Sequence, residues 1–449
     1  MIVMKFGGAA LRDSQSIKNV AKIVNQNIGH DPIIVLSAVG GVTDALLDMG
    51  MQASHGAIDV KAFIELHEKI CSDLDVDFSI FRPLLKELTG VLSAIKSLGV
   101  LRLVEKDALL SFGERFSVRI FSKYLENMGI KSRAYDSWEV GIITTLSHSN
   151  TKILHKTYKD IRKFFETNHM PFWEIPVITG FIAKNSKGEI TTLGRGGSDL
   201  TASIVGTALK CEEIQIWKDV DGILSAEPSI VPNAKVLRRI SYREAHELAF
   251  FGAKILHPQS MIPSKKGNIP IRVKNFLFPD GDGTIISDKT DETEEGLKSL
   301  TCRKDITLVN IESPEMIGEY GYLARIFAIF KALKISVDLI ATSEASISLT
   351  LDNTVNVERL VKRLSSFSEV KVRKKMAIVS LIGTRYYSPT ILSTIFYVFH
   401  KEGVNVEMIS QGASKINIAF VIDEIYADKV IKALHKYLFE KEKSLEVMR

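Results

Sequence analysis

The stretch TTLGRGGSDLTA, residues 191–202, sets three glycines, an arginine, a serine and an aspartate between two apolar runs. The preceding EITTLGR (189–195) reads as a strand after an NSKG hairpin turn (185–188), and apolar residues recur at helical spacing after Ser198. Glycine has no Cβ, so a glycine turn leaves backbone N–H groups free, and a helix start adds partial positive charge. The stretch predicts a strand, a turn and a helix arranged around an anion.

The N-terminal region repeats this arrangement. The apolar run IVMKF (2–6) is followed by Gly7-Gly8 and then by apolar residues at helical spacing. A second strand, IIVLSA (33–38), leads through Gly40-Gly41 into another helical segment. Strands that alternate with helices predict a parallel sheet covered by helices, and we expect this α/β core to continue to about residue 290.

A polar, acid-rich segment, DKTDETEEGLKS (288–299), marks the expected domain boundary. After it the pattern changes to two copies of a βαββαβ unit, each about 70 residues long. The predicted domains are a catalytic domain at 1–292 and two α+β modules at 300–375 and 376–449. Modules of this size are too small for a deep cleft, so they are interpreted as a regulatory tail.

Composition limits the class of protein. The 449 residues are 45% hydrophobic and 25% charged, as in globular proteins, and no apolar run approaches the roughly 20 residues of a membrane helix. The start, MIVMKFGG, reads as a strand and not as an export signal, so a cytoplasmic protein is expected. A net charge of +5 without a long basic block suits small acidic ligands better than nucleic acid. Three widely spaced cysteines argue against disulfides and a zinc site: Cys71, Cys211 and Cys302.

The two glycine turns belong to neither common nucleotide-binding type. The Walker pattern is absent, and Asp199 occupies the third glycine position of the dinucleotide fingerprint. Lys5 ends its strand at the edge where open α/β sheets bind ligands, and its ammonium suits a migrating phosphoryl group. The alternative for Lys5 is a solvated charge at a sheet edge.

Other charged residues suit an amino acid ligand. Arg195 presents a planar fork that matches a carboxylate, and Glu114 in SFGERF suits an ammonium group; the alternative for both is a structural ion pair or a solvated charge. Ser198 and Asp199 are also candidate helix caps. Three more candidate residues also fit purely structural roles. Asp219 fits a turn, Lys254 fits a contact with a helix dipole, and His257 fits packing or capping.

Taken together, the segments resemble the aspartate kinase (aspartokinase) family of the amino-acid kinase superfamily. The matching pieces, in order, are KFGG at 5, LSAVGGVTD at 36, SFGER at 111, GFIA at 180, TTLGRGGSD at 191, DVDGI at 219, IVPNAK at 230 and FGAKILHP at 251. The tail resembles the paired ACT domains of that family. The resemblance implies a three-layer αβα sandwich with a mainly parallel sheet, followed by two ferredoxin-like ACT modules.

The resemblance also implies a reaction, in which ATP with Mg²⁺ phosphorylates the β-carboxylate of L-aspartate. A carboxylate with a reference pKa of about 3.9 is already a nucleophile at neutral pH, so no general base is required. The implied catalytic residues are Lys5, Asp199 and Arg195. The implied substrate-binding residues are Thr43, Glu114, Arg195 and Ser198. The implied nucleotide-binding residues are Lys5, Gly7, Gly8, Ser37, Gly196, Gly197, Lys218, Asp219 and Lys254. No dedicated metal cage is expected, because Mg²⁺ would be carried by the phosphates.

Several positions depart from the family pattern around the nucleotide. KFGG is followed by Ala9-Ala10 where Thr-Ser is usual, and Lys218 replaces a threonine. A tyrosine and an arginine that usually hold the nucleotide are replaced by Leu224 and Ser229.

The first tail module is similar to that of lysine-inhibited aspartokinases. By this likeness the effector-binding residues are Met316, Tyr322, Leu323, Asp338, Ser343 and Glu344. Asp338 and Glu344 suit the ammonium groups of lysine, although VDLI around Asp338 also reads as a buried strand. Assembly as a homodimer or homotetramer through the tail is expected.

Two alternatives remain open at this point. One is another amino-acid kinase, acting on acetylglutamate, glutamate or carbamate. The other is an amino-acid sensor in which a degenerate kinase domain serves only as a scaffold for the ACT pair.

Overall fold

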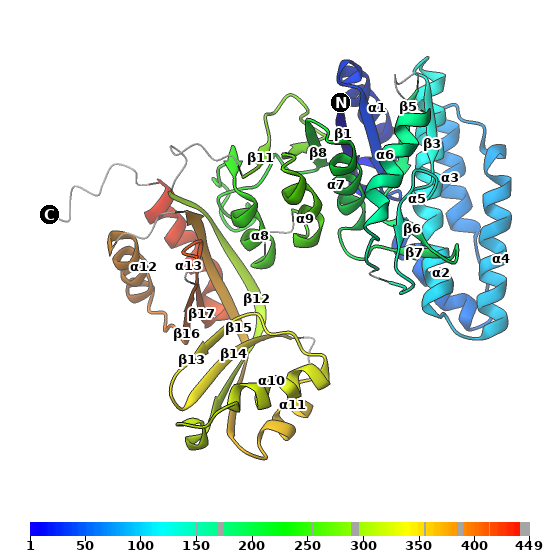
Figure 1. The fold of residues 1–449 in the computed structure, drawn as a ribbon. Helices are drawn as coiled ribbons and strands as arrows, with labels where there is room; N and C mark the ends of the chain where they lie inside the picture. The colour runs from blue at the N-terminus through cyan, green and yellow to red at the C-terminus, as the bar shows by residue number, and fades with distance from the viewer. Residues whose placement is uncertain are drawn as a thin grey trace. The chain divides into compact units, whose positions relative to one another are not determined.

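The computed structural model describes residues 1–149, 151–168, 174–252, 255–288, 296–353, 356–384, 389–412 and 414–440 (Figure 1). The chain forms two compact units. The first comprises Met1–Ile223, Val236–Tyr242 and Ile255–Thr290, and the second Leu224–Lys235, Arg243–Lys254 and Asp291–Arg449.

An eight-stranded sheet is the centre of the first unit. Its order is β3 (Ser132–Tyr135), β5 (Ile175–Thr179), β2 (Pro32–Leu36), β1 (Ile2–Phe6), β8 (Glu213–Lys218), β10 (Ile271–Asn275), β11 (Thr284–Ile286) and β9 (Arg239–Ile240). The strands from β3 to β10 run parallel, and β11 pairs antiparallel with β10. The sheet is therefore mainly parallel, as predicted.

Helices cover both faces of this sheet. One face packs on α1 (Ser14–Gln26), α2 (Val42–Ser54), α3 (Lys61–Asp73), α4 (Arg82–Leu98) and α5 (Leu103–Asn127) through a core that includes Met4, Phe6 and Ile34. The other face carries α7 (Gly197–Leu209), with α6 (Lys156–Asn168) and α9 (Pro258–Gly267) packed beside it. Short 3-10 turns lie at η1 (Gly8–Leu11), η2 (Ile28–His30) and η3 (Phe78–Phe81). The predicted three-layer αβα sandwich is confirmed.

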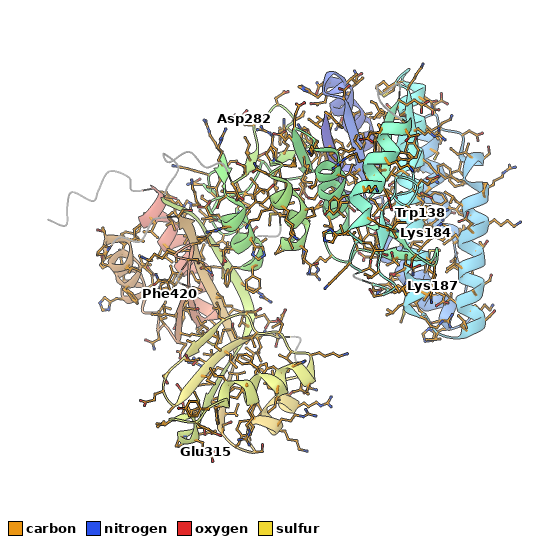
Figure 2. All side chains as sticks on the ribbon, viewed as in Figure 1. Trp138, Lys184, Lys187, Asp282, Glu315 and Phe420 are labelled. Carbon is orange, nitrogen blue, oxygen red and sulfur yellow. The ribbon has the colours of Figure 1, made fainter. Side chains whose placement is uncertain are left out.

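A small sheet in the first unit leads into the glycine turn. Its strands are β4 (Ile143–Thr144), β6 (Ile182–Asn185) and β7 (Ile190–Thr192), and β6 and β7 form the hairpin predicted at NSKG. Gly188 closes this hairpin with a φ of 81°, which favours glycine. In Figure 2, Lys184 of β6 lies beside Trp138, with its Nζ 4.4 Å from the centre of the ring.

The second unit is built on a six-stranded antiparallel sheet. Its order is β13 (Ile340–Thr342), β14 (Ser346–Asp352), β12 (Gly296–Glu312), β15 (Glu369–Thr384), β17 (Asn417–Asp423) and β16 (Met408–Gln411). Its helices are α8 (Tyr242–Phe250), α10 (Tyr322–Leu333), α11 (Val357–Leu364), α12 (Pro389–Glu402) and α13 (Ala427–His435). Short turns occupy η5 (Pro314–Met316), η6 (Glu424–Tyr426) and η7 (Lys436–Glu440).

Two long strands run through both halves of this sheet, as Figure 1 shows for β12 and β15. The first part of β12 pairs with the second part of β15, where Leu300 shares a core with Val379. The second part of β12 pairs with β14, where Val309 enters a separate core. Asp305 and Lys375 have positive φ angles of 59° and 60°, so each strand is interrupted where it passes from one half of the sheet to the other. The first part of β12 therefore belongs to the sheet of the second module, although it comes before the first module in the sequence.

Two segments before residue 292 belong to the second unit. Ala226 and Val231 join the core around Leu300, and the Ser225 hydroxyl lies 2.9 Å from Nε2 of the buried His435. Phe251 joins a further core with Ile306. The limits 1–292, 300–375 and 376–449 therefore stay predictions, because the compact units are interleaved along the chain.

Helix α5 approaches the β2–α2 connection closely because residue 113 is glycine. A Cβ built on Gly113 would lie 2.6 Å from the Cβ of Ala38, which is closer than side chains pack. Gly90 of α4, by contrast, is exposed, and beyond its own stretch of helix no atom of the described residues lies within 4 Å of a built Cβ. The two glycines therefore have different roles in their helices.

We expect Gly113→Ala to destabilise the protein by about 1–3 kcal/mol, because the added methyl forces α5 away from Ala38. Gly90→Ala should instead stabilise it by about 0.5–1 kcal/mol, since alanine costs less entropy in a helix. Urea unfolding of both variants measures the difference. Equal effects of the two substitutions would contradict a packing role for Gly113.

Candidate active site

A cavity of about 360 Å³ lies in the first unit at the carboxyl ends of β1 and β2. This is the edge of a parallel α/β sheet where ligands bind. The chain continues from β1 to β2 on one side of β1, and β8 lies on its other side. The lining residues are Lys5, Gly8, Ser37, Ala38, Val39, Gly40, Gly41, Thr43, Asp44, Glu114, Phe181, Gly194, Gly196, Gly197, Ser198 and Asp199.

Lys5 points to the α7 side of the sheet. Side chains alternate along a strand, and the neighbouring Phe6 is part of the core on the opposite face. The ammonium of Lys5 lies 2.6 Å from Oδ1 of Asp199, in the first turn of α7. Both side chains are only 7% exposed, so the pair is buried at the bottom of the cavity.

Asp199 interacts with two lysines. The Nζ of Lys218, the last residue of β8, lies 3.6 Å from its Oδ2. Burial alone would raise the pKa of Asp199, but the charges of Lys5 and Lys218 hold the pKa below its ordinary value. Burial also lowers the pKa of Lys218, with Asp199 opposing and Lys5 adding to that shift. Two cations share one carboxylate, which leaves an excess of positive charge within this cluster.

Two helix N-termini meet at the same cavity. Gly41, with a φ of 82°, precedes α2, and Gly196, with a φ of 72°, precedes α7. Such termini carry partial positive charge and free N–H groups. A Cβ at Gly196 would lie 2.5 Å from the Cβ of His257, and one at Gly40 would lie 3.0 Å from the oxygen of Gly8. Glycine at these positions therefore lets Gly196 pack against His257, and Gly40 against Gly8, more closely than a residue with a Cβ could. The free N–H groups of the two helix N-termini suit a phosphate group.

Glu114 of α5 forms another wall of the cavity and is 3% exposed. Its Oε1 accepts a hydrogen bond from the N–H of Ala38 at 3.2 Å, and its Oε2 has no hydrogen-bond partner among the described residues. Burial raises the pKa of Glu114 from its ordinary value of 4.5 to about 8, against the opposing effects of Ala38 and Lys5. A ligand ammonium beside Oε2 would supply the missing partner.

Most of the predicted site residues come together. Those that line the cavity are Lys5, Gly8, Ser37, Thr43, Glu114, Gly196, Gly197, Ser198 and Asp199. Lys218 joins them through Asp199, and a Cβ on Gly7 would lie 3.6 Å from the Nζ of Lys5.

The remaining predicted residues are not in the cavity wall. Arg195 is exposed at the tip of the turn between two lining glycines. The pKa of His257 is lowered first by the burial of its own ring and second by the charge of Arg195. Asp219 is exposed beyond the end of β8, and Lys254 lies outside the described residues. The roles of these three residues stay predictions.

Seven lining residues were not predicted as site residues: Ala38, Val39, Gly40, Gly41, Asp44, Phe181 and Gly194. The glycine pair after the second strand repeats the pattern of Gly7-Gly8 and was a usable signal. Phe181 carried no such signal, because an aromatic residue beside a strand normally reads as core. Its φ of 65° is a property of the folded turn.

The predicted effector residues lie in the second unit. Asp338 pairs with Arg303, Oδ1 to Nη1, at 3.0 Å, and its Oδ2 is buried without a hydrogen-bond partner among the described residues. Burial raises the pKa of Asp338, with Arg303 opposing. Tyr322 is buried and donates to the carbonyl of Phe367 at 3.3 Å, and Met316 packs against the same core. The exposed members are Leu323, Ser343 and Glu344.

Within the residues described, no cluster of three or more histidine, cysteine or acidic side chains has the arrangement of a metal site. The helices of the described ranges also include none with the length and apolar content to cross a membrane.

Comparison with known proteins agrees with this geometry. The amino acid kinase family model matches residues 1–275, and an ACT domain model matches residues 379–438. Aspartokinase 1, chloroplastic, of Arabidopsis thaliana is 43% identical over 98% of this chain and 80% of its own length. Lysine-sensitive aspartokinase 3 of Escherichia coli is 32% identical over 98% and 99%.

A solved structure extends the likeness to the whole fold. E. coli aspartokinase III in complex with aspartate and ADP (R-state) superimposes with a TM-score of 0.80 and 30% identity, over 98% of this chain and 100% of that one. The fold and the glycine-rich cavity define an amino acid kinase with a regulatory ACT region. Within that class, the chain belongs to the aspartokinases. The family and fold predicted from the sequence are confirmed.

The raised pKa of Glu114 predicts a pH-dependent loss of stability. Between about pH 4.5 and 8 the folded protein holds a proton that the unfolded chain has released, so stability falls as pH rises through this window. Glu114→Gln removes the effect. Relative to wild type, we expect this variant to gain up to about 1.4 kcal/mol per pH unit in that window.

Urea unfolding of the ligand-free protein at pH 5.5 and 7.5 measures this gain. Glu65→Gln, at an exposed carboxylate of α3, is the control and should show the same pH dependence as wild type. A pH dependence that Glu114→Gln leaves unchanged would show that Glu114 is ionised throughout.

Proposed function

We propose that this aspartokinase transfers the γ-phosphoryl group of ATP to the β-carboxylate of L-aspartate, giving 4-phospho-L-aspartate at the head of lysine, threonine and methionine synthesis. The observation that carries the proposal is the cluster of Lys5, Asp199 and Lys218, in which Lys5 and Asp199 are buried and line one cavity with Glu114. This cavity combines a site for developing phosphoryl charge with a carboxylate for an ammonium group. The E. coli relative whose structure holds aspartate and ADP supports the same pair of ligands.

The chemistry requires positioning and charge neutralisation. The substrate carboxylate is ionised at neutral pH, and no proton has to be removed before it attacks. In this proposal Lys5 and Lys218 stabilise the negative charge that develops on the transferred group, and their ion pairs with Asp199 support this role by fixing their positions. No His-centred triad is needed for this reaction.

The substrate is proposed to lie between Glu114 and the turn before α7. Glu114 receives the α-ammonium at its unpaired Oε2, and Thr43 and Ser198 line the space between. Arg195, on the exposed tip of the turn, has the length and the planar donor fork to bind a carboxylate of aspartate.

The nucleotide is proposed to lie along the glycine turns and the ends of β1, β2 and β8. Its contacts are Lys5, Gly7, Gly8, Ser37, Gly196, Gly197, Lys218, Asp219 and Lys254. A Mg²⁺ ion would be held mainly by the phosphates, because Asp199 is already paired with two lysines and the described residues include no cluster of acidic side chains arranged for a metal. When bound, the ion supplies further neutralisation of phosphate charge.

A coupled assay of ADP release tests the function. Purified protein with MgATP is offered aspartate, glutamate, N-acetylglutamate or carbamate, and we expect turnover on aspartate. Turnover on one of the other acids alone would favour another amino-acid kinase, and no turnover on any would favour the sensor alternative.

Lys5→Met should lower kcat on aspartate by about 10²–10³-fold, the usual effect of removing one group that stabilises transition-state charge. Lys22→Met changes an exposed lysine of α1 and serves as the control. The same assay measures both variants, with thermal melts to verify folding. Retention of most of the rate by Lys5→Met would be incompatible with the assigned role.

We further propose feedback inhibition by lysine at the first tail module. The E. coli relative is described as lysine-sensitive, and the unpaired Oδ2 of Asp338 is a buried acceptor for an ammonium group. The remaining contacts are Met316, Tyr322, Leu323, Ser343 and Glu344. Assembly as a homodimer or homotetramer through the tail belongs to the same proposal, and the cytoplasmic location stays a prediction.

Asp338→Asn should raise the lysine concentration for half inhibition by about tenfold or more, because an ammonium group loses a charged partner. Asp352→Asn is the matched control, since Asp352 also pairs with Arg303, at 2.8 Å, but its side chain is 56% exposed. Titration of lysine, threonine and methionine against the rate measures this. Wild-type rates unchanged by lysine would refute lysine feedback while leaving the catalytic proposal standing.

A further inference from the structure

A buried carboxylate outside the cavity lies on the same helix as Glu114. Asp107 of α5 is fully buried, and it precedes Glu114 by seven residues. Seven residues are two helical turns, about 10.5 Å, so both side chains leave the same face of α5. A carboxylate buried in this way must be satisfied by hydrogen bonds, and its partners show what it holds.

Both oxygens of Asp107 accept hydrogen bonds from segments far away in the sequence. The hydroxyl of Thr192 lies 2.7 Å from Oδ1, and the hydroxyl of Ser149 lies 3.2 Å from the same oxygen. The Ser149 N–H and Nδ1 of His148 lie 2.9 and 3.0 Å from Oδ2. Nε2 of His148 lies 3.5 Å from Glu189, which is joined to β7. Asp107 thus ties α5 to β7 and to the segment beside it.

Thr192 is the last residue of β7 and stands immediately before the glycine turn. Its carbonyl accepts hydrogen bonds from the N–H and the hydroxyl of Thr151, both at 3.1 Å. The next residue, Leu193, donates its N–H to Phe181 at 2.8 Å. Arg195 follows three residues after Thr192, and Ser198 six. The start of the turn is therefore fixed from several sides, and Asp107 provides the link to α5.

We propose that Asp107 is a positioning residue for the amino-acid substrate: through Thr192 it fixes the turn carrying Arg195 and Ser198 relative to Glu114. The inference rests on the proposed function, in which aspartate lies between these walls. One rigid helix then sets both sides of the substrate site, where small displacements have large effects on rate. The nucleotide site shares Gly196 and Gly197 of this turn, but Gly8 and Ser37 follow β1 and β2 and are held by the large sheet instead, so the link should affect nucleotide affinity less than aspartate affinity.

Thr192→Val tests the link with little change of shape. Asp107 keeps its three other donors, and we expect the KM for aspartate to rise about tenfold, with a clearly smaller rise of the KM for ATP. Thr157→Val is the matched control. Thr157 is also a buried threonine of the first unit, but among the described residues its hydroxyl bonds only to the backbone of Ile143, at 3.0 and 3.1 Å.

Asp107→Asn is the stronger variant, because its amide cannot accept from all four donors, and kcat/KM for aspartate should fall by about 10²-fold. Thermal melts report folding, and if Asp107→Asn does not fold, Thr192→Val decides. Equal effects of Thr192→Val and Thr157→Val, or a parallel rise of both KM values, would reduce Asp107 to a purely structural role. Absence of wild-type turnover on aspartate would instead overturn the proposed function, and the positioning role with it.

Discussion

The shared interaction of Asp199 with Lys5 and Lys218 is the constraint on which the site depends. It joins β1, β8 and α7, three elements that are distant in sequence, at one point below the cavity. The buried Lys5 and the half-buried Lys218 together carry one more charge than the carboxylate between them neutralises, and a bound polyphosphate would complement this excess. Each lysine lies at the carboxyl end of a parallel strand, Lys5 as the next-to-last residue of β1 and Lys218 as the last residue of β8, so the sheet holds both at fixed positions before any ligand arrives.

The rest of the kinase unit allows the walls of the cavity to approach this cluster. Gly113 lets α5 bring Glu114 against Ala38, and Gly180 lets the β5–β6 turn touch Ser198, where a Cβ would lie 2.5 Å from that of Ser198. Asp107 acts from the same helix on the other wall. A few small residues and one buried carboxylate thus define the spacing of groups that contact the substrate.

Much of this was readable from the sequence because it is local. Strand, glycine turn and helix follow one another at residues 2–28 and 189–209, and local spacing predicts them. The carboxyl-end position of Lys5 also follows from its place in the strand. The pairing of Lys218 with Asp199, the unpaired oxygen of Glu114 and the partners of Asp107 did not follow, because each depends on contacts between segments 19 to 85 residues apart. The exposure of Arg195 is likewise a property of the folded turn.

The sequence by itself determined the class of fold, the aspartokinase family and most of the residues around the cavity, since these are carried by periodicity and by ordered motifs. Only the tertiary structure decided which charges are paired, which are buried, and how the tail is built. The sharing of β12 and β15 between two modules has no local signal, because a strand carries the same alternating pattern whichever neighbour it pairs with. Pairing between distant segments is a property of the whole folded chain.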